Sequence, residues 1–249
     1  MQYLALHGFT GRGSDFAPLV QSLGGDWHCP DLPGHGPEPR LDCSPVATEA
    51  FVEGESERTF GSDSNIPTIL IGYSMGARAA LNHALQHPNR YSACILISPN
   101  PGIEAPQDRQ ARREVDAKLA HRIEVEGVEA FLEFWQNTPM IRSQQAIPKN
   151  WLEAMQQARR LHTAKGLAAS LREFGQGVTP NLWPEIPLLK MPSILLTGKS
   201  DIKYTQIANR MVREHSQLVH HEIADSGHAP HLEQADAVLE ILKNFLAQF

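Results

Sequence analysis

Short apolar runs bounded by glycine or proline recur along the chain and alternate with amphipathic stretches. Five runs have the length and continuity of strands that are covered on both faces: residues 3–6, 67–72, 93–97, 193–197 and 218–223. Residues 77–86 and 235–249 instead repeat apolar positions at helical spacing. This alternation predicts an α/β protein with a mostly parallel central sheet and helices on both faces.

The alternation stops between about Pro99 and Pro187. Residues 119–134 and 151–171 have amphipathic helical spacing, and the proline-containing residues 137–149 separate them. We therefore expect a helical lid, residues 100–187, inserted into a core that consists of residues 1–99 and 188–249.

Composition narrows the possible functions. A chain of 249 residues, 41% hydrophobic, with a net charge of −6, can bury one sizeable core and lacks the basic excess of a nucleic-acid-binding protein. No apolar run approaches the ~20 residues that span a bilayer, and residues 1–6 lack the basic flank of a signal peptide. We expect a cytoplasmic protein without a membrane span or nucleic-acid partner, as a monomer or weak homo-oligomer.

The cysteines and histidines predict no metal site and no cofactor. Cys29, Cys43 and Cys94 are scattered, without the close pairs of a zinc site or the density of a disulfide framework. No pair of histidines at i, i+4 has an acidic partner within its own motif.

The strongest chemical signal is the pentapeptide Gly72-Tyr73-Ser74-Met75-Gly76, a Gly-x-Ser-x-Gly pattern between a predicted strand and a predicted helix. In this setting a tight turn presents the serine hydroxyl, and small flanking residues leave room for the strained backbone. Ser74 is therefore a candidate nucleophile or base.

A serine of ordinary pKa needs a histidine, and that histidine needs an orienting acid, in the chain order serine, acid, histidine. Asp201 and His228 each follow a predicted strand, so both fall at the sheet edge where α/β proteins bind ligands. Asp225 is an alternative acid, but it lies three residues before His228 on the same loop and is typical of a turn. The sequence predicts a triad of Ser74, His228 and Asp201.

The loop His7-Gly8-Phe9-Thr10-Gly11 directly follows the first predicted strand. A loop at this place typically supplies one amide of an oxyanion hole, and the residue after the serine supplies the other. We expect the backbone N–H groups of Phe9 and Met75 to have this role, whereas a glycine-rich turn without a role is the alternative.

Several motifs together resemble the MenH family, the 2-succinyl-6-hydroxy-2,4-cyclohexadiene-1-carboxylate synthases of the α/β-hydrolase superfamily. They cover nearly the whole chain: His7-Gly8-Phe9-Thr10-Gly11, Asp31-Leu32-Pro33-Gly34-His35-Gly36, Gly72-Tyr73-Ser74-Met75-Gly76-Ala77-Arg78, Gly166-Leu167-Ala168-Ala169-Ser170-Leu171, Leu182-Trp183, Gly198-Lys199-Ser200-Asp201-Ile202-Lys203-Tyr204 and Gly227-His228-Ala229-Pro230-His231-Leu232-Glu233. The serine, acid and histidine segments are common to many α/β-hydrolases, and the arginine, lysine and lid motifs are more particular.

The resemblance implies a lyase of menaquinone (vitamin K2) biosynthesis that eliminates pyruvate from 2-succinyl-5-enolpyruvyl-6-hydroxy-3-cyclohexene-1-carboxylate. Ser74, made basic by His228, would then remove a proton instead of forming an acyl-enzyme. The substrate would be a small polycarboxylate, and arginine suits carboxylates because its planar fork binds them bidentately.

The resemblance also implies substrate-binding residues. It assigns Arg78, Arg112 and Arg159 to substrate carboxylates, Tyr73 and Trp135 to the pocket, and Lys203 to the neighbourhood of the triad. Arg113 and Arg160 remain alternatives to their neighbours in the lid. Ala77, and Lys199-Ser200, depart mildly from the family pattern.

Two other functions remain open on the sequence. A carboxylesterase, thioesterase or carbon–carbon bond hydrolase would use the same triad, because a fold alone does not fix the reaction. A catalytically inactive α/β-hydrolase fold that only binds a ligand would have no need of all three triad residues.

Overall fold

The computed structural model describes residues 1–60 and 66–249 and contains one six-stranded sheet in the order β2-β1-β3-β4-β5-β6. The paired strands are all parallel. The strands are β1 (Gln2–Leu6), β2 (Asp26–His28), β3 (Thr68–Tyr73), β4 (Ala93–Ile97), β5 (Ser193–Gly198) and β6 (Leu218–Ile223). The predicted α/β fold with a parallel sheet is confirmed.

The central strands β3, β4 and β5 are buried along their whole length, as their continuous apolar runs predicted. In the edge strand β6 the first and last residues are buried, and the residues between them are exposed or half-buried. The other edge strand, β2, was not predicted, because only three residues, Asp26, Trp27 and His28, pair with β1 and they contain no apolar run.

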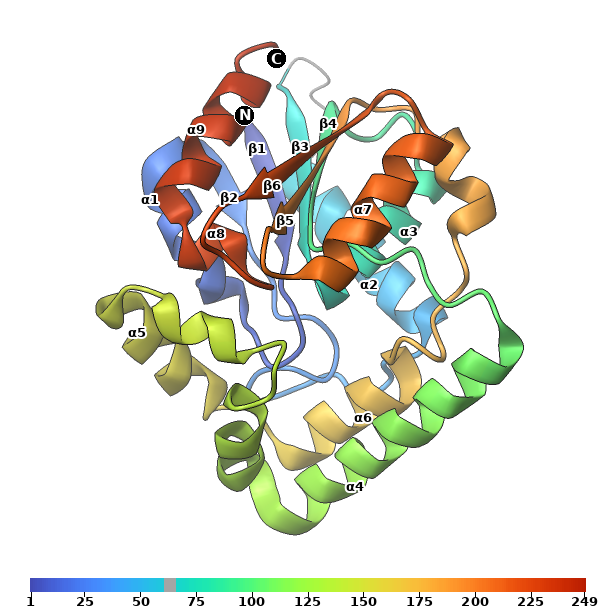
Figure 1. Cartoon of the computed structure of the whole chain (residues 1–249), viewed down its shortest axis with the longest axis vertical. Coiled ribbons are helices and arrows are strands. Elements are labelled where there is room, and N and C mark those ends of the chain that lie inside the picture. Colours follow the sequence, from blue (N-terminus) through green and yellow to red (C-terminus); the bar gives the residue numbers. More distant parts are fainter. Residues whose placement is uncertain (61–65) are drawn as a thin grey trace.

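Helices cover both faces of the sheet (Figure 1). On one face lie α1 (Ala17–Leu23) and α9 (Ala235–Leu246), and on the other lie α2 (Pro45–Phe60), α3 (Met75–Gln86) and α7 (Ile202–Glu214). The short helices are η1 (Gly13–Phe16), η3 (Trp183–Leu188) and α8 (Pro230–Glu233).

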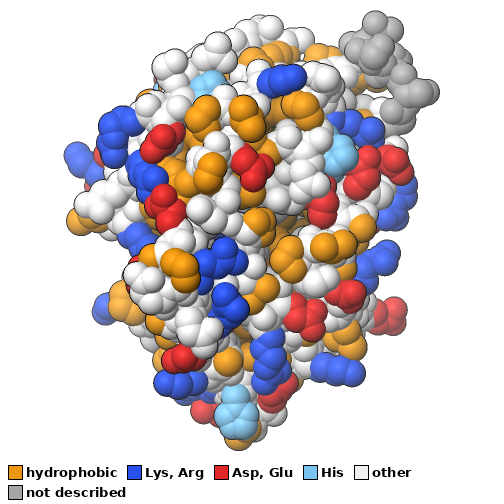
Figure 2. Space-filling model, turned by 90° about the vertical axis from the view of Figure 1, so that its right-hand side faces the viewer, with side chains coloured by type: hydrophobic (Ala, Val, Ile, Leu, Met, Phe, Trp, Pro, Cys, Tyr) orange, Lys and Arg blue, Asp and Glu red, His pale blue; other side chains and the backbone are white. Residues whose placement is uncertain are grey.

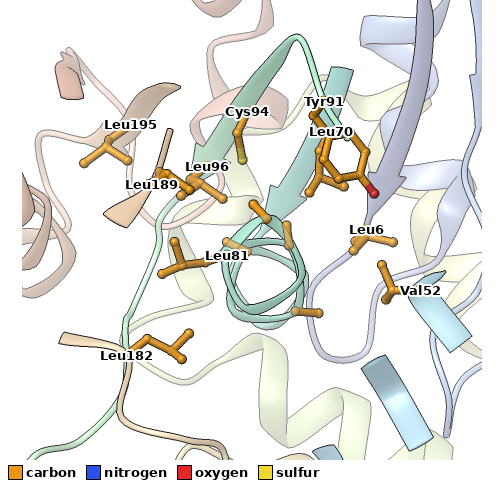
Figure 3. Packing of buried hydrophobic residues seen from close by; sticks show 14 of the residues in the cluster. Leu6, Val52, Leu70, Leu81, Tyr91, Cys94, Leu96, Leu182, Leu189 and Leu195 are labelled. Carbon is orange, nitrogen blue, oxygen red and sulfur yellow. The ribbon is translucent and has the colours of Figure 1, made fainter. Parts of the chain in front are cut away.

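The helix α3 lies at the centre of the second face. Figure 3 shows Leu81 of this helix on the side of Leu96 of the sheet, and Leu70 of the sheet and Val52 of α2 around the same helix. Each of these side chains is completely buried, and full burial of a leucine contributes roughly 1.5–3 kcal/mol to folding. The helix that follows Ser74 is therefore firmly packed.

A helical insertion lies between β4 and β5 and covers one end of the sheet (Figure 1). It consists of α4 (Pro106–Gln136), η2 (Arg142–Ala146), α5 (Lys149–Arg159) and α6 (Ala164–Phe174). The lid boundaries at residues 100 and 187 stay predictions.

The insertion departs from its predicted helices in two places. The expected stretch 151–171 is divided into α5 and α6, because the Thr163 side chain accepts a hydrogen bond from Gly166 N at 3.0 Å and begins a new helix. The long helix α4 is kinked at Gly127, whose φ of 82° lies in the left-handed region that favours glycine.

The surface carries both signs of charge. Figure 2 shows lysine and arginine side chains interspersed with acidic ones on the face that it displays. None of the described helices is long and apolar enough to cross a membrane.

Candidate active site

Ser74 lies at the sharp turn from β3 to α3, where its backbone adopts φ 52° and ψ −105°. The glycines on either side are required by close contacts. A Cβ at Gly72 would lie 2.5 Å from Gly76 O, and one at Gly76 would lie 1.9 Å from Leu6 O. The turn therefore lifts the serine out of the sheet edge only because small residues flank it.

The three predicted triad residues meet in series. Ser74 Oγ lies 2.8 Å from His228 Nε2, and His228 Nδ1 lies 2.6 Å from Asp201 Oδ2. Asp201 follows β5 and also caps α7, where its side chain accepts a hydrogen bond from Tyr204 N. The rival acid Asp225 is exposed in a turn with φ 51°. An imidazole held between a hydroxyl and a carboxylate can take and return a proton.

The loop that carries His228 is held by two residues that were not predicted from the sequence, Ser98 and Glu233. Ser98 Oγ donates a hydrogen bond to His228 O at 2.8 Å. The buried Glu233 carboxylate accepts hydrogen bonds from Gly227 N and from Ala229 N, on either side of His228. Glu233 lies five positions after His228 in the sequence. Its role could not be predicted, because the sequence alone does not show that this carboxylate is buried.

A cavity of about 50 Å³ lies beside the serine. Both residues expected to supply oxyanion-hole amides line it, together with two of the predicted arginines and the predicted tryptophan. The predicted residues along its wall are Ser74, Phe9, Met75, Arg78, Arg112 and Trp135. Residues from the loop after β1, the turn before α3, α3 itself and α4 thus meet at one place, and Tyr204 of α7 also lines the wall.

Arg78 is 8% exposed, and burial lowers the pKa of its guanidinium to about 10. Its Nη2 donates to Phe174 O at 3.1 Å, whereas its buried Nε has no protein hydrogen-bond partner among the described residues. The buried Trp135 Nε1 likewise has none. Buried donors without a partner are costly, so this cavity has unused capacity to bind an acceptor.

Arg112 is held by neighbours in the insertion. Its Nε donates to Asp116 Oδ1 at 2.8 Å, and its Nη1 donates to Gln176 Oε1 at 2.8 Å. Burial raises the pKa of Asp116, although Arg112 acts against that rise. Arg112 therefore faces the cavity with part of its hydrogen-bonding capacity already used.

Three predicted substrate-binding residues do not line the serine cavity. Arg159 is buried and donates to Gln144 Oε1 at 3.0 Å, and Gln144 Nε2 donates to Tyr73 Oη at 3.2 Å. Tyr73 packs behind the triad, with its ring 5.6 Å from that of His228. Lys203 is exposed on α7, and desolvation, followed by Arg112, lowers its pKa.

A second cavity of about 350 Å³ lies between α4 and α5. Arg159 and Arg160 line it, and Trp135 belongs to its wall as well as to that of the serine cavity. Arg160 is largely exposed beside Glu129, and Arg113 is exposed. The roles of the lid arginines stay predictions.

A histidine of the insertion joins it to the core loops. Gly36 N donates to His162 Nδ1 at 2.9 Å, so the other ring nitrogen, Nε2, carries the proton that bonds Thr10 O at 3.0 Å. Nearby, Leu32 N donates to His7 Nε2. Burial lowers the pKa of both His7 and His162 to about 4, and it lowers that of the neighbouring His35 well below its usual value. These rings are neutral at pH 7.

Comparison with known proteins agrees with this geometry. The alpha/beta hydrolase family matches residues 4–241. A Bacillus subtilis (strain 168) protein, provisionally named a 2-succinyl-6-hydroxy-2,4-cyclohexadiene-1-carboxylate synthase, is 32% identical, and the alignment covers 98% of this chain and 89% of that protein. The structure of MenH from S. aureus has 28% identity and a TM-score of 0.86, with 99% of this chain and 94% of that chain covered.

A plant protein matches in part of its length. Protein PHYLLO, chloroplastic, of Arabidopsis thaliana is 30% identical over 98% of this chain, but the chain spans only 15% of that protein. The family match over most of the chain and the full-length relatives lead to the same result: this chain belongs to the α/β-hydrolase family and is a homologue of the MenH synthases.

Proposed function

We propose that this protein is a 2-succinyl-6-hydroxy-2,4-cyclohexadiene-1-carboxylate synthase of menaquinone biosynthesis, a lyase that eliminates pyruvate. The observation that carries the proposal is the serine cavity, whose wall includes Arg78 and Trp135 with buried, unpartnered donors. An enzyme for a neutral ester has no use for an excess of buried donors beside its serine, whereas a polycarboxylate lyase does.

The reaction is a 2,5-elimination on the cyclohexene ring. The C2–H bond breaks, a double bond forms between C2 and C3, the C3–C4 double bond moves to C4–C5, and the C5–O bond breaks. The leaving enolpyruvate takes up a proton and becomes pyruvate. The hydrogen at C2 lies next to the ketone of the succinyl group, so its loss produces an enolate.

The triad would act as the base for this step. His228 takes the Ser74 proton, and the serine oxygen removes the C2 proton, while Asp201 stabilises the imidazolium that forms. The backbone amides of Phe9 and Met75, whose residues line the cavity, would bind the enolate oxygen.

The arginines would bind the carboxylates of the substrate. Arg78 lies one helical turn after Ser74 on α3, so its guanidinium reaches the same cavity. Arg112 of α4 lines the same cavity. Two guanidinium groups on different elements would orient the ring and leave its C2–H bond toward the serine.

The direct test is to incubate the purified protein with the enolpyruvyl precursor and follow pyruvate by a coupled lactate dehydrogenase assay. We expect release with the wild type and a loss of at least about 10²–10⁴-fold with Ser74→Ala. Absence of release from a folded wild type, or equal release from Ser74→Ala, would overturn the proposal.

A further inference from the structure

A cluster of four side chains lies apart from the serine cavity, where α2 packs against α3. His83 lies in the last turn of α3, and His87 is the non-helical residue that directly follows this helix. Glu49 and Glu53 are four residues apart on α2 and share one face of it. No metal site was predicted here because the acidic residues come from the neighbouring helix.

The distances in this cluster are those of a coordination site. One ligand atom from each of Glu49, His83 and His87 lies within 4.8 Å of the other two. Glu49 Oε1 lies 3.3 Å from His87 Nε2, close to the ~3.3 Å that separates two ligands of a tetrahedral zinc ion bound at ~2.0 Å. Glu49 Oε1 lies only 2.5 Å from His83 Nδ1, so binding requires a shift of under about 1 Å there.

The protein contacts leave buried polar atoms in the cluster unsatisfied. His83 is completely buried, and its Nε2 has no hydrogen-bond partner among the described residues. The acceptor nearest to this nitrogen is Glu53 Oε2, at 3.5 Å. This oxygen is also buried, has no hydrogen-bond partner among the described residues, and lies 3.4 Å from His87 Nε2. Both atoms therefore have hydrogen-bonding capacity that the described residues do not use.

A neighbouring side chain orients the carboxylate of Glu49. Asn82 Nδ2 donates to Glu49 Oε2 at 2.8 Å, which leaves Oε1 directed at the two histidines. Hydrogen bonds of this kind orient the ligands of metal sites.

We propose that Glu49, His83 and His87 bind a divalent transition-metal ion of the zinc class. The proton that His83 Nδ1 now donates to Glu49 Oε1 would be lost to solvent while Nε2 takes one up, so that His83 binds through Nδ1 and donates from Nε2 to Glu53; His87 would bind through Nε2. Two imidazoles and a carboxylate are ligands that zinc accepts, and the two glutamates balance the charge of a dication. The side chains of His87 and Glu53 are 32% and 30% exposed, so an ion and a water molecule at the fourth position can enter from the surface.

The site would be structural and separate from catalysis. His83 lies in the last turn of α3, whereas Ser74 immediately precedes the first residue of that helix. With a rise of about 1.5 Å per residue, the helix holds the two sites more than about 10 Å apart. The ion would join the C-terminal end of α3 to α2, and a helix C-terminus favours positive charge.

The test uses Zn²⁺ and Co²⁺ alone, added to full-length protein that has been dialysed against a chelator. We expect one tight equivalent by isothermal titration calorimetry, a higher Tm, and the intense visible absorption of tetrahedral Co²⁺. In His87→Gln the affinity should fall by at least about 100-fold, more than the 10- to 100-fold typical of losing an outer hydrogen bond. In Asn82→Ala, which removes such a bond, we expect a loss of about 10-fold.

Matched controls separate this cluster from other histidines. His121→Gln changes an exposed histidine on α4 and should leave the affinity unchanged, and His228→Gln should leave it unchanged even though the triad is lost. Far-UV circular dichroism checks that His87→Gln remains folded. Glu53→Gln provides a second variant of the same cluster. Absence of a tight equivalent, or equal weakening in His87→Gln and His121→Gln, would overturn the proposal.

Discussion

The end of the sheet and the helical insertion line the same cavity, but their polar side chains are held in different ways. At the sheet, Ser74, His228 and Asp201 follow β3, β6 and β5 and bond one another in series. Around the cavity and in the insertion, guanidinium and indole groups keep buried donors for which the described residues offer no hydrogen-bond partner: Arg78 of α3, Trp135 of α4 and Arg159 of α5.

The difference separates two tasks. The triad needs no ligand to complete its hydrogen bonds, so its geometry is set before a substrate arrives. The unpartnered donors gain most from a ligand that supplies acceptors, so they discriminate between substrates. We therefore expect the sheet edge to hold the groups that transfer the proton, and the unpartnered donors around the cavity to select the substrate.

Asp201→Asn should have the largest effect and tests the sheet side of this comparison. An amide cannot stabilise the imidazolium and favours the wrong tautomer of His228, so we expect kcat to fall about 10³- to 10⁴-fold with little change in KM. Steady-state pyruvate release measures both. Asp225→Asn, at the exposed rival position, is the control, and a larger loss in that variant would reassign the acid.

Arg78→Ala tests the role of the unpartnered donors in this comparison. Loss of a charged donor from the cavity should lower kcat/KM for the enolpyruvyl precursor by about 10- to 100-fold, because a hydrogen bond to a charged group contributes about 1.5–3 kcal/mol. Any weak cleavage of a p-nitrophenyl ester should remain nearly intact, since that substrate has no carboxylate. Arg113→Ala, on the exposed face of α4, serves as the control. Equal loss of both activities would favour the hydrolase alternative.

Acid should weaken the attachment of the insertion to the core. The pKa of buried His162 is about 4, whereas in the unfolded chain it returns to about 6.5. Between these values the unfolded chain binds a proton that the folded chain does not, so stability falls as the pH decreases through this window. For His162 the loss from pH 7.5 to pH 5 is roughly 2 kcal/mol.

Comparison with a variant separates the contribution of His162 from that of Asp15. Burial raises the pKa of Asp15 to about 6, so its contribution to the pH dependence of stability has the opposite sign. Urea unfolding of the wild type and of His162→Gln at both pH values should show a smaller pH dependence in the variant. The same pH dependence in both proteins would show that His162 does not titrate in this range.

Trp135→Phe should have the smallest effect. The substitution keeps an aromatic ring in the wall shared by the two cavities and removes the Nε1 donor together with part of the indole ring. A neutral hydrogen bond contributes about 0.5–1.5 kcal/mol, so kcat/KM for the precursor should fall about 2- to 10-fold. An unchanged value would mean that this indole contacts no substrate acceptor.

Residues with a local signature could be found from the sequence, and residues that act through distant contacts could not. Ser74 was recognisable because its glycines are dictated by the turn itself. Glu233 and Ser98 hold the His228 loop through contacts that only the folded chain creates. The cluster of Glu49 with His83 and His87 joins two helices, so the spacing within either helix was insufficient to reveal it.

The same limit explains why some predicted elements differ from the observed ones. The periodicity of residues 151–171 continues through the break between α5 and α6, because both helices bury apolar residues against the rest of the chain. The strand β2 exists only because β1 offers an edge for three residues. Local pattern identifies long, buried elements, and tertiary contacts determine where short ones begin and end.

The small cavity beside Ser74 has a consequence for turnover. Ligand sites for molecules of this size enclose roughly 300–1,000 Å³, whereas the space here is about 50 Å³. The proposed substrate, a ring with three carboxylates, would fit only if the wall around Trp135 moved, and this residue also lines the adjoining space between α4 and α5. Binding and release would then require that movement in every cycle.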